Sequence, residues 1–179
     1  MKRKTQTITK TAAKTIAMLI ISTVLFTSCT VVEDIINLQA GMTRPSEYEQ
    51  RYDVAEDVFM WLDETLLSTP LPDNLHFTLR NNSEQTYGYS LRMSLEKKLH
   101  GIWRAVLPYQ NYEVPDIVIF IEPFSSETHS FPLFFYHNNL RPGQYRIVQR
   151  VQEWQEINEI DELFERQNTY IVFAEFTII

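Results

Sequence analysis

Residues 87–97 alternate between apolar and polar side chains with a period of two, and this alternation limits the possible folds more than any other feature. The apolar set is Tyr87, Tyr89, Leu91, Met93 and Leu95, and the intervening set is Gly88, Ser90, Arg92, Ser94 and Glu96. Successive side chains of a β-strand point to opposite faces of its sheet. The segment therefore predicts a strand with one buried face and one solvated face, as in an antiparallel sheet.

Further segments with strand character lie on both sides of this one, at residues 58–63, 75–80, 102–106, 116–121, 131–135, 144–151 and 170–179. Most alternate, but residues 116–121 are apolar at nearly every position, which predicts a place inside the sandwich or beneath a loop. Pro132 restricts its strand to a sheet edge or a bulge, because proline cannot donate a hydrogen bond. His100 and Gly101 predict a hairpin turn.

About seven or eight short strands follow one another without helical crossovers between most of them. This pattern is typical of an all-β antiparallel sandwich or a small barrel. Residues 153–165 are the exception, because Ile157, Ile160, Leu163 and Phe164 recur at helical intervals between acids. They predict a short amphipathic helical insert before the last strand. The insert either covers the end of the core, presents Trp154, Ile157, Ile160 and Phe164 to a partner, or is disordered.

The first 28 residues have the three parts of a bacterial export signal: a basic start, an apolar run at residues 16–26, and the small residues Thr27 and Ser28. The run of 11 residues is much shorter than the roughly 20 needed to span a bilayer. Residues 25–29 resemble a lipobox, with Phe26 where leucine is more usual. We therefore expect cleavage after residue 28 and a diacylglyceryl thioether on Cys29. The alternative is an ordinary buried cysteine beside an uncleaved anchor.

Residues 29–56 show no lasting periodicity and predict a lipidated N-terminus followed by a tether, with the sandwich domain at residues 57–179. Cys29 is the single cysteine, so the domain contains no internal disulfide. The leader has five bases and no acid, so its removal changes the formal net charge from −7 to −12. Such an acidic surface repels nucleic acid. We expect a lipid-anchored, extracytoplasmic location at the cell surface, or at the periplasmic or outer membrane of a diderm host.

Several motifs resemble those of the bacterial immunoglobulin-like domain family found on small surface lipoproteins. They are Asn81-Asn-Ser83, Tyr87-Gly-Tyr89, Leu95-Glu-Lys-Lys98, Gly101-Ile-Trp103, Leu140-Arg-Pro-Gly-Gln-Tyr-Arg-Ile-Val148 and Phe173-Ala-Glu-Phe176. Their order and spacing cover residues 57–179. The resemblance implies an immunoglobulin-like sandwich, a surface location and no known catalytic activity. The long acidic segment before Thr169 departs from the usual pattern.

Two aromatic side chains have predicted structural roles. Leu140-x-Pro-Gly143-x-Tyr145 is the pattern of a tyrosine corner, in which the ring enters the core and the hydroxyl bonds the backbone a few residues upstream. Trp103 is expected to pack between the sheets as a large apolar side chain whose N–H requires a partner. Each of the two residues has contact with a ligand as its alternative role.

The sequence contains no pattern that indicates catalysis. The four histidines lack metal-ligand spacing, and neither a nucleophile elbow nor a phosphate loop nor a dinucleotide fingerprint is present. We therefore expect no metal and no cofactor. Glu96, Lys97 and Lys98 predict solvated charge at a strand end. Aromatic residues in predicted loops either close the ends of the core or take part in recognition: Tyr109, Tyr112, Phe124, Tyr136 and Trp154.

These observations favour a non-enzymatic, lipid-anchored envelope protein whose domain binds a protein or a glycan, or serves as part of an envelope complex. The partner and the oligomeric state are not specified by the sequence. The alternative is a secreted enzyme or enzyme inhibitor whose site is assembled from loop residues far apart in the chain. A cleft with converging histidine and acidic side chains would favour that alternative.

Overall fold

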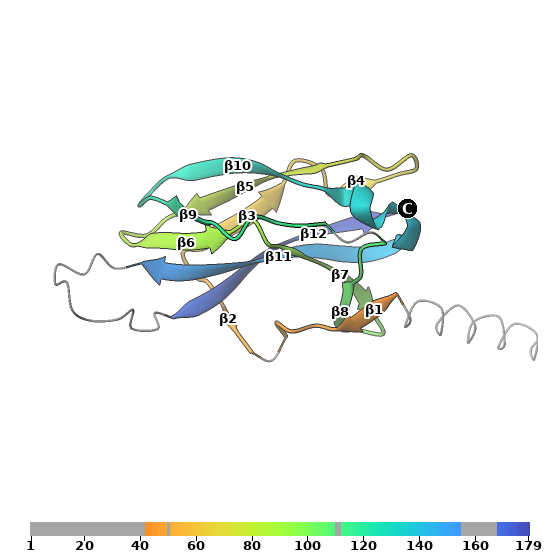
Figure 1. Ribbon diagram of the computed structural model, residues 1–179, viewed down its shortest axis with the longest axis horizontal. Helices are drawn as coiled ribbons and strands as arrows, with labels where there is room; N and C mark the ends of the chain where they lie inside the picture. The colour runs from red at the N-terminus through yellow and green to blue at the C-terminus, as the bar shows by residue number, and fades with distance from the viewer. Residues whose placement is uncertain (1–41, 50, 110–111, 155–167) are drawn as a thin grey trace, which may run out of the picture. The chain divides into compact units, whose positions relative to one another are not determined.

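Two sheets packed face to face form the described part of the chain, which comprises residues 42–49, 51–109, 112–154 and 168–179 of the computed structural model (Figure 1). The larger sheet has the order β1-β8-β7-β11-β12-β2. These strands are β1 (Thr43–Pro45), β8 (Ile102–Val106), β7 (Ser94–Leu99), β11 (Gly143–Trp154), β12 (Thr169–Ile178) and β2 (Asp53–Val54). Three more strands join it: β6 (Thr86–Ser90) on β11, β9 (Val118–Ile121) on β6, and β4 (Leu66–Leu67) on β12.

The smaller sheet has three antiparallel strands in the order β10-β5-β3. They are β10 (Ser126–Phe131), β5 (Leu75–Asn81) and β3 (Val58–Leu62), and a 3-10 helix at Leu133–Asn139 follows β10. The all-β sandwich predicted from the sequence is confirmed.

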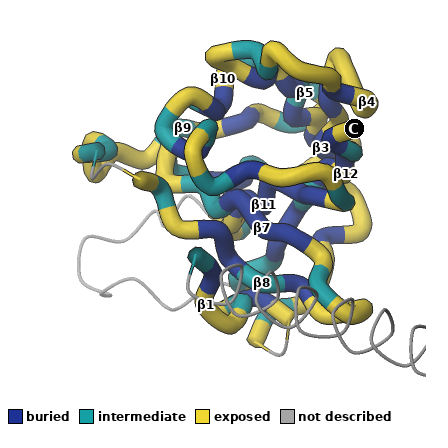
Figure 2. The backbone as a smooth tube through the Cα atoms, turned by 90° about the vertical axis from the view of Figure 1, so that its right-hand side faces the viewer, coloured by how far each residue is buried: buried dark blue, intermediate teal, exposed yellow. Residues whose placement is uncertain are grey.

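The core lies between the two sheets and follows the predicted alternation (Figure 2). On β3 the buried side chains are Val58, Met60 and Leu62, and the two between them are exposed. The inward face of β12 is likewise formed by Val172, Ala174, Phe176 and Ile178. Each strand of this kind has one face that removes apolar surface from water, at about 25 cal/mol per Å² buried.

The hairpin between β7 and β8 turns at the two predicted residues. Leu99 pairs with Ile102, and His100 and Gly101 lie between them with φ of 52° and 83°. Two successive left-handed residues form the turn whose twist matches that of the flanking strands.

Residues 87–97 form two strands rather than the single strand predicted. Tyr89 on β6 pairs with Val151, and Ser94 on β7 pairs with Val148. The four residues between Tyr89 and Ser94 therefore lie opposite the two residues between Val148 and Val151 on β11. The two surplus residues make a bulge in which Leu91 is exposed. Because the number of surplus residues is even, the same alternate positions face the core before and after the bulge, and Tyr89 and Leu95 are both buried there. An unbroken alternation therefore does not reveal this bulge.

Two other predicted strands are corrected. The strand predicted at residues 131–135 instead occupies residues 126–131, and Pro132 ends it before the 3-10 helix. The strand predicted at residues 116–121 is an edge strand rather than an interior one, because among the described residues β9 pairs with β6 alone. Val118 is 58% exposed, whereas Ile121 is fully buried.

The compact folded unit begins at Met42, within the segment that the sequence predicts as a tether. β1 pairs with β8 and β2 pairs with β12, and Tyr48 and Tyr52 between them pack on the outer face of the larger sheet. Tyr48 in this segment is only 4% exposed and packs with Val148 and Ile171. We call residues 43–49 and 51–54 the N-terminal strap.

Candidate functional site

Tyr145 and Gly143 lie together at the start of β11. The fully buried Tyr145 hydroxyl donates to the Arg141 carbonyl at 2.6 Å and accepts from the Arg141 backbone N–H at 3.0 Å. Burial raises the pKa of this hydroxyl. Gly143 has φ of +147°, and a Cβ there would lie 3.0 Å from Lys97 Cε. These are the contacts of a tyrosine corner in which position 143 requires glycine.

Lys97, on the neighbouring strand β7, packs against this corner. Its ammonium group donates to the carbonyls of Arg141 and Pro142 at 3.3 and 3.2 Å, and it lies 5.2 Å from the centre of the Tyr145 ring. The residue is only 5% exposed, so the prediction of solvated charge is wrong for it. Burial, and then repulsion from Arg141, lower the pKa of Lys97.

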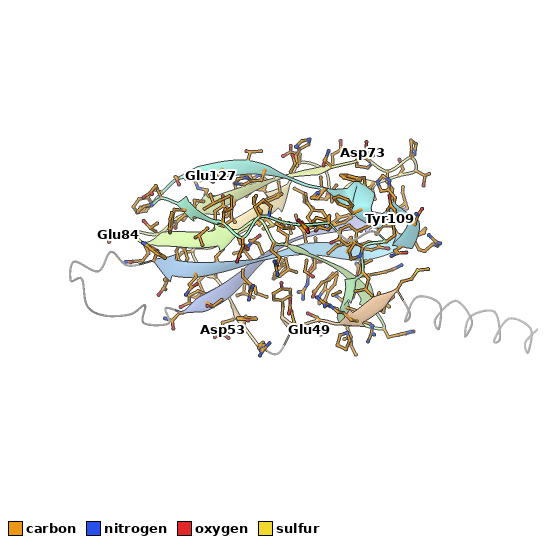
Figure 3. The ribbon with its side chains drawn as sticks, viewed as in Figure 1. Glu49, Asp53, Asp73, Glu84, Tyr109 and Glu127 are labelled. Atoms are coloured by element: carbon orange, nitrogen blue, oxygen red, sulfur yellow. The ribbon has the colours of Figure 1, made fainter. Side chains whose placement is uncertain are left out.

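Trp103 lies on the outer face of the larger sheet and not between the two sheets as predicted. It pairs with Lys98 on β7, and its ring contacts the guanidinium group of Arg146 at 4.5 Å. The N-terminal strap, on which Glu49 lies (Figure 3), contacts it. The backbone N–H of Trp103 donates to Glu49 Oε1 at 3.1 Å. The ring is 7% exposed. Trp103 therefore belongs to a second packed layer outside the main core.

The same layer contains a buried ion pair. Arg146 Nε donates to Glu96 Oε2 at 2.8 Å, and Glu96 is 0% exposed, which corrects the prediction of solvated charge at this position. The guanidinium group also faces the ring of Phe173 at 5.1 Å. Within the described residues, Glu96 Oε1 has no hydrogen-bond partner. Strand alternation placed Glu96 on the face opposite the core, but the strap covers that face.

A pocket of about 210 Å³ lies at the edge where β6 of the larger sheet approaches β10 of the smaller sheet. Its walls include the rings of Phe77, Tyr89, Tyr112 and Phe131, and Gln149 lies among them with 2% exposure. The ring of His129 packs in a tilted orientation against that of Phe77, with 5.6 Å between ring centres. The pocket is mostly apolar, with a few polar groups at one side.

Tyr89, Glu127 and His129 form a hydrogen-bonded cluster beside this pocket. The Tyr89 hydroxyl donates to Glu127 Oε2 at 2.5 Å and lies 2.6 Å from His129 Nε2. Burial and the bond to Glu127 raise the pKa of Tyr89. The hydroxyl of Ser130, the residue after His129 in the sequence, hydrogen-bonds to His76 Nδ1 at 2.9 Å and not to the cluster. The cluster thus links the two sheets.

The outer face of the smaller sheet carries an exposed row of aromatic side chains beside rows of hydrogen-bonding ones. Phe59 and Trp61 of β3 are 46% and 44% exposed. The register places Phe59 beside Arg80 and then Ser126, and Trp61 beside Thr78 and then Thr128. We call these six residues the polar–aromatic face. The sequence predicts the alternating strand at residues 58–63 that carries the two aromatics, but sequence reasoning did not single them out.

The other residues named as possible binding sites are dispersed. Trp154 ends β11, is 37% exposed and meets Phe120 edge-to-face at 4.8 Å. Cys29, Ile157, Ile160 and Phe164, together with the predicted helical insert beyond residue 154, lie outside the described residues. Tyr136 is buried against Phe131, whereas Tyr109 and Phe124 are exposed.

The described residues contain no group of three or more His, Cys, Asp and Glu side chains arranged to hold a metal ion. Within the same ranges, no helix has the length and hydropathy required to cross a membrane.

Comparison with protein families gives a match to the bacterial Ig-like domain over residues 56–175. Comparison with curated proteins gives no significant match. Ig-like domains of this kind are commonly extracellular and typically non-catalytic. The matched residues include the whole smaller sheet and the larger sheet except β1, β2 and the end of β12. They also include the tyrosine corner, the buried ion pair and the polar–aromatic face. The chain belongs to the bacterial Ig-like domain family.

Proposed function

We propose that this chain is exported, lipidated on Cys29 and held at the extracytoplasmic side of a membrane, where its Ig-like domain is a non-enzymatic binding module. The leader and its terminal Cys29 support export and anchoring. A single acyl chain binds a membrane weakly, so stable attachment requires more than one. The family match supports a surface or binding module.

The observation that carries the binding role is the polar–aromatic face. Two large rings side by side are exposed on a strand whose opposite face is buried, and apolar surface left in water is a mark of interaction sites. Aromatic residues are also enriched among the side chains that dominate binding energy. The partner is a protein or a glycan of the envelope.

Photo-crosslinking in intact cells tests this role. A benzophenone amino acid replaces Phe59 in one variant and Phe124, which is 63% exposed on the turn after β9, in a matched control. We expect an adduct from position 59 and none from position 124. Equal adducts from the two positions, or none from either, contradict a binding role for this face.

The acidic segment before β12 is a second proposed contact region, since Ile157, Ile160 and Phe164 follow the exposed Trp154 in the sequence. Deleting residues 155–167 while keeping β11 and β12 tests it. Unchanged adducts at position 59 together with unchanged partners in chemical crosslinking remove the segment from the binding role.

An enzyme or enzyme inhibitor remains the alternative function, and the cluster of Tyr89, Glu127 and His129 is the observation that favours it. The three side chains satisfy one another across the two sheets, and the family is typically non-catalytic, so binding ranks first. Hydrolysis of an envelope polymer by the purified protein that is lost in His129→Gln would reverse this order.

A further inference from the structure

We propose that the polar–aromatic face binds an uncharged glycan chain. This inference names the ligand class of the binding function proposed above and therefore rests on it. The face consists of Phe59, Trp61, Thr78, Arg80, Ser126 and Thr128, all on the outer side of the smaller sheet.

The two rings form a column along β3. Val58, Met60 and Leu62 alternate with them and are at most 8% exposed, so the rings project away from the core. Positions two apart on a strand are separated by about 7 Å, and both rings lie on the same face. The C–H groups on one side of a pyranose ring carry small positive charge, and they stack on the negative face of an aromatic ring. A chain of sugars running along β3 would thus cover both rings.

Hydrogen-bonding groups lie directly beside this column, in two rows that cross the sheet. The hydroxyls of Thr78 and Thr128 are 3.2 Å apart, and the guanidinium group of Arg80 lies 3.5 Å from Ser126 Oγ. A hydroxyl has one donor and two acceptor positions, so this mutual pairing leaves capacity for a ligand. Neighbouring strands are about 5 Å apart, which places these groups at the edge of a sugar stacked on Phe59 or Trp61.

The charge and the composition of the polar–aromatic face favour a neutral glycan over anionic polymers and over proteins. The face has one charged side chain, Arg80, on a mature chain of formal charge −12, which disfavours anionic polymers. Three of its six residues are serine or threonine. Serine is depleted in protein–protein interfaces, and both residue types are under-represented among the side chains that dominate their energy. The same hydroxyls match the dense hydroxyls of a sugar.

The test measures binding of the detergent-purified full-length protein to microcrystalline cellulose, chitin and an array of soluble neutral oligosaccharides, with polygalacturonate as the anionic probe. The variants are Trp61→Ala, the isosteric pair Thr78→Val with Thr128→Val, and the control Phe124→Ala. We expect the parent and Phe124→Ala to bind at least one neutral probe. We expect at least about tenfold weaker binding in Trp61→Ala and a loss of several-fold in the threonine pair, since these changes remove the stacked ring and the hydroxyls. Circular dichroism establishes that each variant is folded.

Four outcomes overturn the inference: no binding to any neutral probe, preference for polygalacturonate, parent-like binding by folded Trp61→Ala, and a dimer of the parent that Trp61→Ala converts to a monomer. The photo-crosslinking above distinguishes this failure from that of the proposed function. Adducts at position 59 without neutral-glycan binding refute the glycan and leave the binding module. Absence of both refutes both.

Discussion

Replacing Arg146 by methionine removes one partner of the buried ion pair and leaves the Glu96 carboxylate in a site with 0% exposure. Breaking a buried pair from one side costs about 3–5 kcal/mol, because the remaining charge is desolvated without compensation. This is a large share of the 5–15 kcal/mol that stabilises a typical domain. We expect Arg146→Met to be folded but strongly destabilised.

The structure predicts an asymmetry between the two single variants. In Glu96→Leu the guanidinium group of Arg146 keeps its contacts with the rings of Trp103 and Phe173, at 4.5 and 5.1 Å. Such cation–π contacts contribute about 0.5–2 kcal/mol. Glu96→Leu should therefore destabilise the protein by about 1 kcal/mol less than Arg146→Met. The double variant removes both charges and should lie within about 1 kcal/mol of the parent.

Urea unfolding followed by tryptophan fluorescence measures these differences, since Trp103 lies beside the pair. We expect the midpoint of Arg146→Met to fall by about 2 M with an unchanged slope. The double-mutant cycle should give a coupling energy of about 3 kcal/mol or more between the two residues. A loss below about 1 kcal/mol in Arg146→Met, or additive effects in the double variant, would refute the reasoning.

Three further predictions concern the tyrosine corner and its surroundings. Tyr145→Phe should cost about 1–3 kcal/mol in thermal unfolding because it removes both hydrogen bonds to Arg141, and the control Tyr109→Phe at an exposed ring should cost less than about 0.5 kcal/mol. Gly143→Ala should cost about 1–3 kcal/mol, since φ of +147° disfavours a Cβ and Lys97 lies in its way; a neutral result contradicts the assignment. The free energy of unfolding should be constant up to about pH 10 and should fall above it. A tyrosine whose pKa is raised in the folded protein stays protonated there, whereas the same tyrosine in the unfolded chain loses its proton, so unfolding becomes more favourable. The tyrosines with a raised pKa include the buried Tyr48, Tyr89, Tyr136 and Tyr145. The lowered pKa of Lys97 acts in the opposite direction at a single site, so stability that rises between pH 10 and 11.5 in urea titrations would contradict this prediction.

The alternation in the sequence was sufficient to predict β3, β5 and β12, because each has one face on the core. The hairpin at His100 and Gly101 was predictable for a local reason, since two residues determine the turn. The tyrosine corner was likewise predicted from a short local pattern, and the structure gives Tyr145 the two hydrogen bonds that the pattern requires.

The features that sequence reasoning missed depend on distant parts of the chain. β10 was missed because its inward side chains include Glu127 and His129, whose polarity is satisfied by Tyr89 from the other sheet. The burial of Glu96 depends on the strap, which covers a face that alternation alone marks as solvated. The polar–aromatic face appears only when the register aligns residues of three strands, of which Phe59 and Ser126 are 67 positions apart in the sequence.

The measurement that most directly tests the proposed lipoprotein is the mass of the N-terminal peptide from the membrane fraction of cells expressing the full chain. We predict a peptide that begins at Cys29 and carries a diacylglyceryl group, and that is replaced by the uncleaved form when globomycin blocks processing. A peptide that begins at Met1 in untreated cells, or an unmodified Cys29, would contradict the account.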